Sequence, residues 1–272
     1  MIHAVGKPYI EAVDPIWNEA RREAEAALKR EPAVSSMMYS AILNHSSLEE
    51  AVIARIADRL ETSDLRSSLF VETYREALAD QPALGAMMRA DIMAVYERDP
   101  ACIRFIEPIL YFKGFHTLEA HRLAHWLIKQ GRRDLALTIQ SAMSERFQVD
   151  INPGVVMGRG IFLDHATGVV IGETAVIGDN VSILQSVTLG GTGKETGDRH
   201  PKIGNGVLIG AGAKVLGNIK IGSCARIAAG SVVLKDIPSN TTVAGVPAKV
   251  VGQAGCPEPA RAMDQILAEK DL

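Results

Sequence analysis

The chain has 272 residues, 47% of them hydrophobic and 22% charged, and a formal net charge of −3 at pH 7. Acidic and basic residues are interspersed along it, which argues against nucleic acid or a membrane surface as the main partner. It has no apolar run near the ~20 residues that span a bilayer, and its first residues, MIHAVGKPYIEAVDP, lack a signal-peptide core, so we expect a cytoplasmic protein.

The first half of the chain is helical in character. From Pro15 to about Phe147, apolar residues recur at helical spacing, glycine is sparse, and Ala, Leu, Glu and Arg dominate. We therefore predict an all-helical domain over residues 1–147. Its helices are expected over Pro15–Lys29, Val34–Asn44, Ser47–Leu60, Ser67–Asp80, Ala83–Asp99, Thr117–Lys129 and Arg133–Arg146.

One of these helices carries two histidines, His121 and His125, four residues apart. Side chains at this spacing share a helix face and can bind zinc together. However, Arg122 stands where the zinc motif HExxH has its glutamate, and the sequence suggests no third ligand. We therefore predict that both histidines pack between helices, and we expect no metal site.

From Ile151 to Val233 the chain steps forward in sixes. An aliphatic residue marks each step, often followed by Gly, and a small or β-branched residue recurs four positions later. A period of six predicts short strands joined by equal corners, a left-handed parallel β-helix of hexapeptide repeats over residues 148–252, with a tail over 253–272. The predicted fold class is α+β with segregated domains. The markers are Ile151, Met157, Leu163, Ile171, Ile177, Ile183, Leu189, Ile203, Ile209, Val215, Ile221, Ile227 and Val233.

This rhythm breaks twice, and each break carries a histidine. Two extra residues lie between Leu163 and Ile171, where His165 of LDHATG should face outward. A gap of fourteen residues after Leu189 leaves room for a protruding loop that contains His200. A prism filled with aliphatic side chains has no pocket of its own, so its chemistry must lie on its outer faces, on its loops or between neighbouring prisms.

The motifs VDINP, LDHATG, SVTLGGTGK and GDRHPKI, placed behind a helical domain, resemble those of the serine O-acetyltransferase family. The resemblance covers the chain from about Ile16 to Gly252. A hexapeptide array alone indicates only an acyltransferase, and LDHATG followed by GDRHPKI narrows the resemblance to the serine enzyme. It implies transfer of acetyl from acetyl-CoA to L-serine, the first step of cysteine biosynthesis.

A general base is the first requirement of this chemistry, because the hydroxyl of serine is a weak nucleophile. The unperturbed pKa of histidine, about 6.5, suits that task, so we predict that His165 is the base. The resemblance implies that Asp150 holds the imidazole of His165. On the hexapeptide count, the position one coil above Asp150 is near Gly168, which permits the pair.

The charges of serine indicate further roles. Arg199 offers a guanidinium for the carboxylate of serine. The ammonium needs carboxylates, and by resemblance Asp164 and Asp91 match the positions that the family uses. His200, or a backbone amide of the glycine-rich loop, is expected to stabilise the oxyanion.

Acetyl-CoA, the co-substrate, is expected in a groove between two prisms. Its pantetheine arm should lie on exposed backbone near four residues with small or absent side chains and near two lysines that are candidates for its phosphates. These residues are Gly191, Thr192, Ala211 and Gly212, and the lysines are Lys220 and Lys249.

Partners follow from the resemblance. It implies a homotrimer of prisms, with two trimers joined by their helical domains into a hexamer. L-Cysteine, which differs from serine by one atom, should compete with it as a feedback inhibitor. Members that assemble with cysteine synthase commonly end in isoleucine, whereas Leu272 ends this sequence and should dock more weakly.

Other interpretations stay open. The acceptor can be another hydroxyl, such as that of homoserine or a sugar. A carbonic anhydrase on the same kind of prism needs three histidine ligands for zinc, and the repeats contain only His165 and His200. A non-catalytic scaffold is the third class. A covalent route through Cys224 is conceivable, but no histidine is near it in sequence, so we predict direct transfer.

Overall fold

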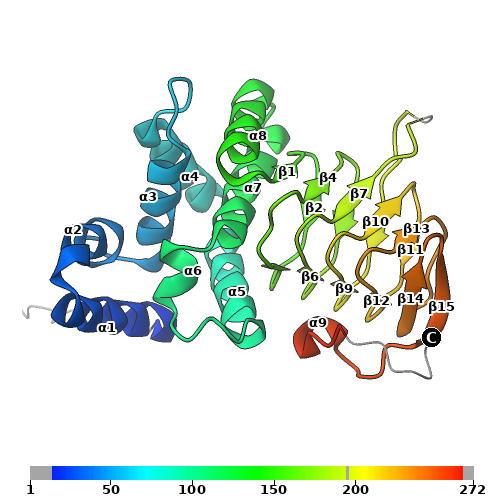
Figure 1. Ribbon diagram of the computed structural model, residues 1–272. Coiled ribbons are helices and arrows are strands. Elements are labelled where there is room, and N and C mark those ends of the chain that lie inside the picture. The colour runs from blue at the N-terminus through cyan, green and yellow to red at the C-terminus, as the bar shows by residue number, and fades with distance from the viewer. Residues whose placement is uncertain (1–13, 194–195, 266–272) are drawn as a thin grey trace, which may run out of the picture.

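The computed structural model describes residues 14–193 and 196–265, and in it a helical part is followed by a β-helix (Figure 1). The α+β class with segregated helices and strands is therefore confirmed. The last long helix ends at Phe147 and the first strand begins at Asp150, while the exact division into domains stays a prediction. Within the described ranges, no helix is both long enough and apolar enough to cross a membrane.

The helices of the first part lie close to their predicted ranges. Local signals set their starts: Asp14 accepts a hydrogen bond from the Trp17 amide over 3.2 Å, and Ser47 accepts one from the Glu50 amide over 3.3 Å. The sequence did not indicate α6 or the first turn of α7. The bounds are α1 (Pro15–Arg30), η1 (Pro32–Val34), α2 (Ser35–Met38), η2 (Tyr39–Leu43), α3 (Leu48–Leu60), α4 (Ser67–Asp80), α5 (Ala83–Arg98), α6 (Ile106–Leu110), α7 (Lys113–Lys129) and α8 (Arg133–Phe147).

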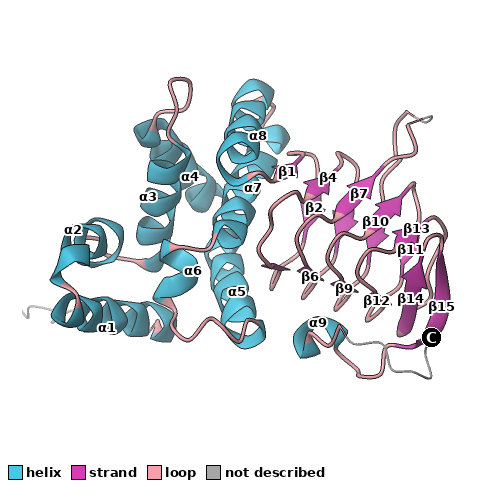
Figure 2. Ribbon diagram, in the orientation of Figure 1, coloured by secondary structure: helices cyan, strands magenta, loops and turns pink. Residues whose placement is uncertain are grey.

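The β-helix has three sheets of short strands, one for each side of the prism (Figure 2). Apart from a final antiparallel hairpin of β14 and β15, the paired strands run parallel, and this is the left-handed β-helix that the period of six predicts. Sheet A contains β1 (Asp150–Ile151), β4 (Val170–Ile171), β7 (Thr188–Gly190), β10 (Lys214–Leu216) and β13 (Val232–Val233). Sheet B contains β2 (Val156–Met157), β5 (Val176–Ile177), β8 (Lys202–Ile203) and β11 (Lys220–Ile221). Sheet C contains β3 (Phe162–Leu163), β6 (Ser182–Ile183), β9 (Leu208–Ile209), β12 (Arg226–Ile227), β14 (Thr241–Gly245) and β15 (Ala248–Gln253).

The marker residues stack in the interior, as predicted. Ile171 pairs with Leu189, which pairs in turn with Val215, and all three are buried. The first coil is longer than the repeat. Asp150 pairs with Val170, so the prediction that it lies below Gly168 is wrong, because the two extra residues at the His165 corner shift the register.

Two corners of the prism border sheet A, and they differ. We call the corner between sheets C and A the histidine edge, since it contains residues 164–169, followed on successive coils by 184–187, 210–213 and 228–231. The corner between sheets A and B, with residues 172–175, 191–201 and 217–219, is the loop edge. A side of six extended residues spans at most about 20 Å. The two edges of one chain are therefore separated by the width of sheet A.

Helices cover sheet C at the start of the prism. Both α5 and α7 contact β3, and α8 contacts β1. Gly114 permits the close approach of α7, because a Cβ there would lie 2.0 Å from the carbonyl oxygen of Leu163. The tail contains a short helix, α9 (Pro259–Ala262), which contacts α5 and β9 (Figure 1). The helical part thus supports the strand that leads into LDHATG.

Candidate active site

The ring of His165 projects from the histidine edge, as predicted. Its side chain is 75% exposed, and its Nε2 lies 3.7 Å from Oδ1 of Asp164. Both His165 and Ala166 have positive φ values, of 54° and 60°. Two consecutive non-glycine residues in the left-handed region are costly, and such strain often accompanies function. The extra residues of this corner therefore push the imidazole outward.

A cavity of about 330 Å³ adjoins this ring. It lies where β3, the end of α5 and the start of α7 meet, and its wall contains the side chains of Asp99, Lys113, Asp164 and His165. Its lining also includes the ring of Tyr111 and the apolar residues Val95, Ala101, Phe112, Phe115, Phe162 and Leu163. The wall thus offers two carboxylates, one ammonium and one imidazole over an apolar floor.

The electrostatics of the cavity depend on Asp164. Burial raises the pKa of the Asp164 carboxyl, His165 lowers it, and the charge of Asp99 raises it again. Two carboxylates this close favour a cation between them. Lys113 donates a hydrogen bond to the hydroxyl of Thr167, and burial, followed by the charge of Arg59, lowers the pKa of its ammonium. The site can therefore bind a small molecule that carries both a positive and a negative group.

Asp150, the predicted partner of the base, lies on the coil below His165 at the same edge. The two coils are joined there by a hydrogen bond of 2.8 Å from the Gly168 amide to the carbonyl of Gln148. The carboxylate of Asp150 accepts a hydrogen bond of 2.6 Å from Nε2 of Gln140 in α8. The ring of His165 pairs with Asp164 instead, so the dyad of His165 and Asp150 stays a prediction.

Arg199 and His200 lie at the loop edge, across sheet A from His165. The guanidinium of Arg199 pairs with Glu173 over 3.0 Å and donates to the carbonyl of Gly197 over 2.9 Å. We predicted His200 in a protruding loop, but its side chain is buried, with 6% of the residue exposed. It fits against Gly172, where a Cβ would lie 2.0 Å from its Nε2.

Thr174 fixes the tautomer of His200. Its amide donates to Nδ1 of the ring over 3.2 Å, so in the neutral ring Nε2 carries the proton and can donate. Burial lowers the pKa of His200, and the charges of Arg199 and Lys202 lower it further. A neutral donor of this kind suits the predicted role at an oxyanion. However, sheet A separates His200 from His165 of the same chain, so the two rings cannot act on one substrate there.

The residues predicted to bind acetyl-CoA divide between the two edges. Ala211 and Gly212 lie on the histidine edge, where the Gly212 amide donates to the carbonyl of Gln185 over 2.9 Å. Gly191 and Thr192 follow β7 on the loop edge. The two lysines lie elsewhere, on β11 and β15, and both are exposed: Lys220 and Lys249.

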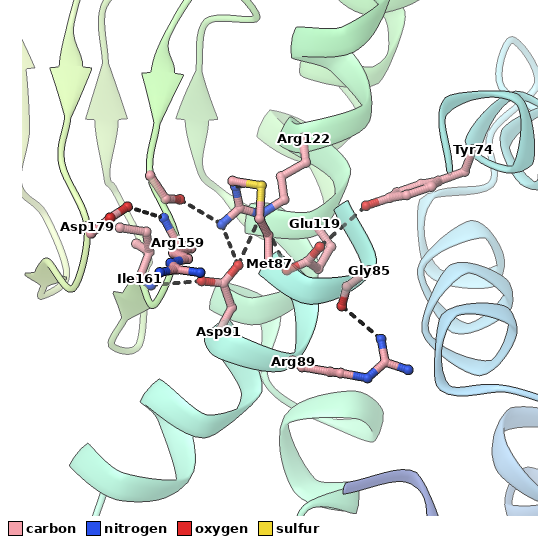
Figure 3. A network of polar contacts seen from close by, with 11 residues as sticks. Tyr74, Gly85, Met87, Arg89, Asp91, Glu119, Arg122, Arg159, Ile161 and Asp179 are labelled. Carbon is pink, nitrogen blue, oxygen red and sulfur yellow. Dashed lines mark hydrogen bonds and ion pairs between the residues drawn. The ribbon is translucent and has the colours of Figure 1, made fainter. Parts of the chain in front are cut away.

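Asp91 does not line the cavity. It is fully buried in α5, where Arg122 donates to its Oδ2 from Nε over 3.0 Å and the Ile161 amide donates to its Oδ1 over 2.8 Å (Figure 3). This position corrects the prediction that Asp91 binds the ammonium of serine, since a buried carboxylate with its lone pairs occupied cannot reach a ligand. Asp99, eight residues later in the same chain, is in the cavity wall.

Sequence reasoning missed Asp99 and Lys113. Asp99 directly follows α5 and is its C-cap residue, in an extended conformation. The signal in the sequence was a second aspartate at the end of the predicted helix Ala83–Asp99, so that either aspartate could face the β-helix. Lys113 begins α7, four residues before the predicted start of that helix at Thr117. Nothing in the sequence indicates that Lys113 contacts the corner formed by LDHATG.

The histidines of α7 pack against the first coil of the β-helix, and the prediction that they pack between helices is wrong in this respect. His121 is 1% exposed with its Nε2 3.2 Å from the carbonyl of Val155, and Nδ1 of His125 lies 2.9 Å from the carbonyl of Pro153. Among the described residues, no group of three or more His, Cys, Asp or Glu side chains is arranged to hold a metal ion.

A prism of hexapeptide coils with an outward histidine at one corner defines a hexapeptide-repeat acyltransferase. Residues 16–120 match the family described as "Serine acetyltransferase, N-terminal", and residues 200–235 match "Bacterial transferase hexapeptide (six repeats)". The serine acetyltransferase of Salmonella typhimurium is 51% identical over 255 residues, 94% of this chain and 93% of that protein. This chain belongs to the serine acetyltransferase family.

Solved structures agree. The serine acetyltransferase of Brucella abortus in complex with coenzyme A is 58% identical, with a TM-score of 0.89 over 90% of this chain and 98% of that one. A soybean serine acetyltransferase complexed with serine is 52% identical, with a TM-score of 0.85 over 87% and 97%. A serine acetyltransferase in complex with cysteine is 46% identical, with a TM-score of 0.90 over 93% and 98%.

Proposed function

We propose that this chain is a serine O-acetyltransferase, which transfers acetyl from acetyl-CoA to the hydroxyl of L-serine and yields O-acetyl-L-serine and CoA. Relatives of about half-identical sequence carry this name over nearly the whole chain, and their solved structures hold coenzyme A or serine. The observation in this molecule that carries the proposal is the cavity beside His165, whose wall combines Asp99, Asp164 and Lys113.

The cavity suits an α-amino acid. The ammonium of serine would lie between Asp164 and Asp99, which explains why two carboxylates share one small site. Lys113 of the same wall, or Arg199 of a second copy, would receive the carboxylate. In this arrangement the serine hydroxyl would lie near the imidazole of His165, and the apolar floor would receive the methylene group.

The reaction then follows from one proton. His165 takes the proton of the serine hydroxyl as the oxygen attacks the thioester carbonyl of acetyl-CoA, and a tetrahedral oxyanion forms. Asp164, 3.7 Å away, stabilises the imidazolium, and Asp150 would do so from the coil below. The C–S bond breaks as the oxyanion collapses, and the thiolate of CoA regains the proton from His165.

The separation of the two edges supports an oligomeric site. Because sheet A lies between His165 and the pair Arg199 and His200, one chain cannot bring them together, whereas two packed prisms can join the histidine edge of one copy to the loop edge of the next. We therefore propose a homotrimer with shared sites, joined through helical domains into a hexamer. Acetyl-CoA would lie in the same groove, between Ala211 and Gly212 of one copy and Gly191 and Thr192 of the other.

Regulation and location complete the proposal. L-Cysteine would occupy the serine site as a feedback inhibitor, in line with the relative that was solved with cysteine. A cytoplasmic location suits the supply of acetyl-CoA. The proposed contact with cysteine synthase would involve Leu272, which lies outside the described residues.

Thiol release from acetyl-CoA tests the proposal, with serine, threonine, homoserine and a sugar as alternative acceptors. Serine should give the highest kcat/KM. Asp99→Asn should raise the KM for serine about tenfold or more, since it removes one of the two carboxylates beside the ammonium, with little change in the KM for acetyl-CoA. Equal rates with a sugar would overturn the assignment of serine, and homoserine as the better acceptor would replace it.

A further inference from the structure

Four polar residues are buried together where the helical part meets the first coil of the β-helix (Figure 3). Asp91, Glu119 and Tyr74 have no exposed surface, and Arg122 is 4% exposed. They come from three helices, α4, α5 and α7. Burial of an unbalanced charge is costly, so the protonation states of this cluster are strongly constrained.

Arg122 forms hydrogen bonds with Asp91 and only a longer ion pair with Glu119. Both its Nε and its Nη2 donate to Oδ2 of Asp91, and Nη2 also donates to the carbonyl of Gly158 over 2.9 Å. Nε lies 3.7 Å from Oε1 of Glu119, beyond hydrogen-bond distance. With the Ile161 amide on its other oxygen, Asp91 has the environment of an ionised carboxylate.

Glu119 has the opposite environment. The hydroxyl of Tyr74 donates to its Oε2 over 3.3 Å, while Oε1 is buried without a hydrogen-bond donor. Nε of Arg122 lies 3.7 Å from Oε1 of Glu119 and donates to Oδ2 of Asp91 over 3.0 Å, so two buried carboxyls flank one guanidinium. Their mutual contact is favourable only if one of them carries a proton. Burial raises the pKa of Glu119 well above its usual range; Arg122 opposes this shift, and the charge of Asp91 reinforces it.

We propose that Glu119 is protonated and donates to the carboxylate of Asp91, so that Asp91, Glu119 and Arg122 form one neutral unit that positions the active-site strand on the helices. The net charge supports this proposal, because the positive charge of Arg122 balances the negative charge of Asp91, and a protonated Glu119 adds none. The titratable groups that act on Glu119 are Tyr74 of α4, Asp91 of α5 and Arg122 of α7.

This unit connects directly to the candidate active site. It holds the backbone of the first coil at Gly158 and at Ile161, three residues before Asp164. On α5, Asp91 lies eight residues, about 12 Å of helix, before Asp99 in the cavity wall. A shift at the unit therefore changes the separation between Asp99 and Asp164. These are positioning residues, because they do not touch the cavity.

Protonation of Glu119 is testable without enzyme activity. A carboxyl with a raised folded-state pKa gives its full stabilisation below its unfolded pKa and loses it as pH rises toward the folded value. Glu119→Gln keeps the donor and removes the titration. Above about pH 5.5, the unfolding equilibrium constant of the wild type should therefore rise with pH relative to that of the variant, by up to about tenfold per pH unit until Glu119 ionises in the folded protein.

A matched control comes from Glu49, a partly buried carboxyl that forms an ion pair with Arg89. Burial raises its pKa, but hydrogen bonds from Arg89 and others outweigh this, and the pKa is lowered overall. Glu49→Gln should therefore differ from the wild type by a constant amount over the same pH range. Melting temperatures measure both series. A constant difference for Glu119→Gln would show that Glu119 is ionised and would overturn the proposal.

The positioning role rests on the proposed function and has its own readout. Glu119→Gln should keep the wild-type KM for serine, because its amide can still donate to Asp91. Glu119→Met, of similar length but without a donor, should raise the KM for serine about tenfold with the KM for acetyl-CoA unchanged. Asp91→Asn gives the same test if the Met variant does not fold. A wild-type KM for serine in a folded variant without the donor would refute positioning, while loss of all activity on serine in the wild type would instead refute the proposed function.

Discussion

A comparison of the two edges that border sheet A shows how a prism without an internal pocket can support catalysis. The histidine edge is supported by helices: α5 and α7 contact β3, and a cavity opens beside an imidazole that is 75% exposed. At the loop edge, the polar side chains of residues 191–201 are bonded instead to the coil below, with Arg199 on Glu173 and His200 on Thr174. One edge has a base and a pocket, and the other has donors. Neither is complete alone.

The largest effect is expected at the histidine edge. His165→Ala removes the proposed base and should lower kcat for acetyl transfer by about 100-fold or more, because serine is then not deprotonated. His45→Ala is the matched control: this ring lies 2.8 Å from the carbonyl of Ser40 in the helical part and should leave kcat unchanged. Thiol release measures both variants. An unchanged rate in His165→Ala would favour another mechanism, such as the route through Cys224.

Two glycines allow the edges to be perturbed separately. A Cβ at Gly114 would meet the backbone of Leu163, which cannot move aside alone, so Gly114→Ala should lower the free energy of unfolding by about 1–3 kcal/mol and displace the pocket. A Cβ at Gly172 would meet the ring of His200, a side chain that can rotate. Gly172→Ala should therefore cost less stability.

Denaturation and kinetics of these two variants, measured side by side, check this difference. Gly172→Ala should reduce kcat while the protein remains folded, because the displaced ring of His200 leaves the loop edge. If Gly172→Ala were the less stable of the two variants, the contrast between the helix contact at Gly114 and the side-chain contact at Gly172 would be wrong.

Acid should weaken the support of the histidine edge. Burial lowers the pKa of His116 to about 3, and Arg59 adds to this; burial, with His125 and Arg122, lowers that of His121 to about 3. Below about pH 6.5 the unfolded chain binds protons that the folded chain does not, so stability falls as pH falls, by about 1.4 kcal/mol per pH unit for each histidine.

The melting temperature as a function of pH measures this loss. His121→Gln, which retains a donor for the carbonyl of Val155, should show a shallower decline than the wild type between about pH 6.5 and about pH 4. Parallel curves for the two proteins would show that His121 does not titrate on unfolding in the predicted sense.

The sequence was informative wherever structure is local. The interior position of the prism recurs every six residues, so Ile171 and Leu189 could be placed without any knowledge of the rest of the chain. Amphipathic periodicity likewise predicted α3 and α4 closely. The short α6, with Pro108 inside it, has too few residues for a period to emerge. The outward histidine followed from the same counting, because extra residues at a corner must bulge.

Contacts between distant elements were not predictable. Asp91 lies within α5 and Asp99 directly follows it, and only the packing of that helix on β3 decides which aspartate is buried with Arg122 and which lines the cavity. The same holds for Lys113, which reaches Thr167 because α7 begins against that corner. The buried ring of His200 follows from a hydrogen bond to Thr174, on the coil below.

Mixed oligomers of two inactive variants test the shared site most directly. His165→Ala inactivates the histidine edge and Arg199→Ala the loop edge, so each variant alone should have little activity. In oligomers assembled from equal amounts of both, about a quarter of the junctions should combine two intact edges and regain about a quarter of wild-type activity. Activity no greater than the mean of the two separate variants would contradict a site that is shared between copies.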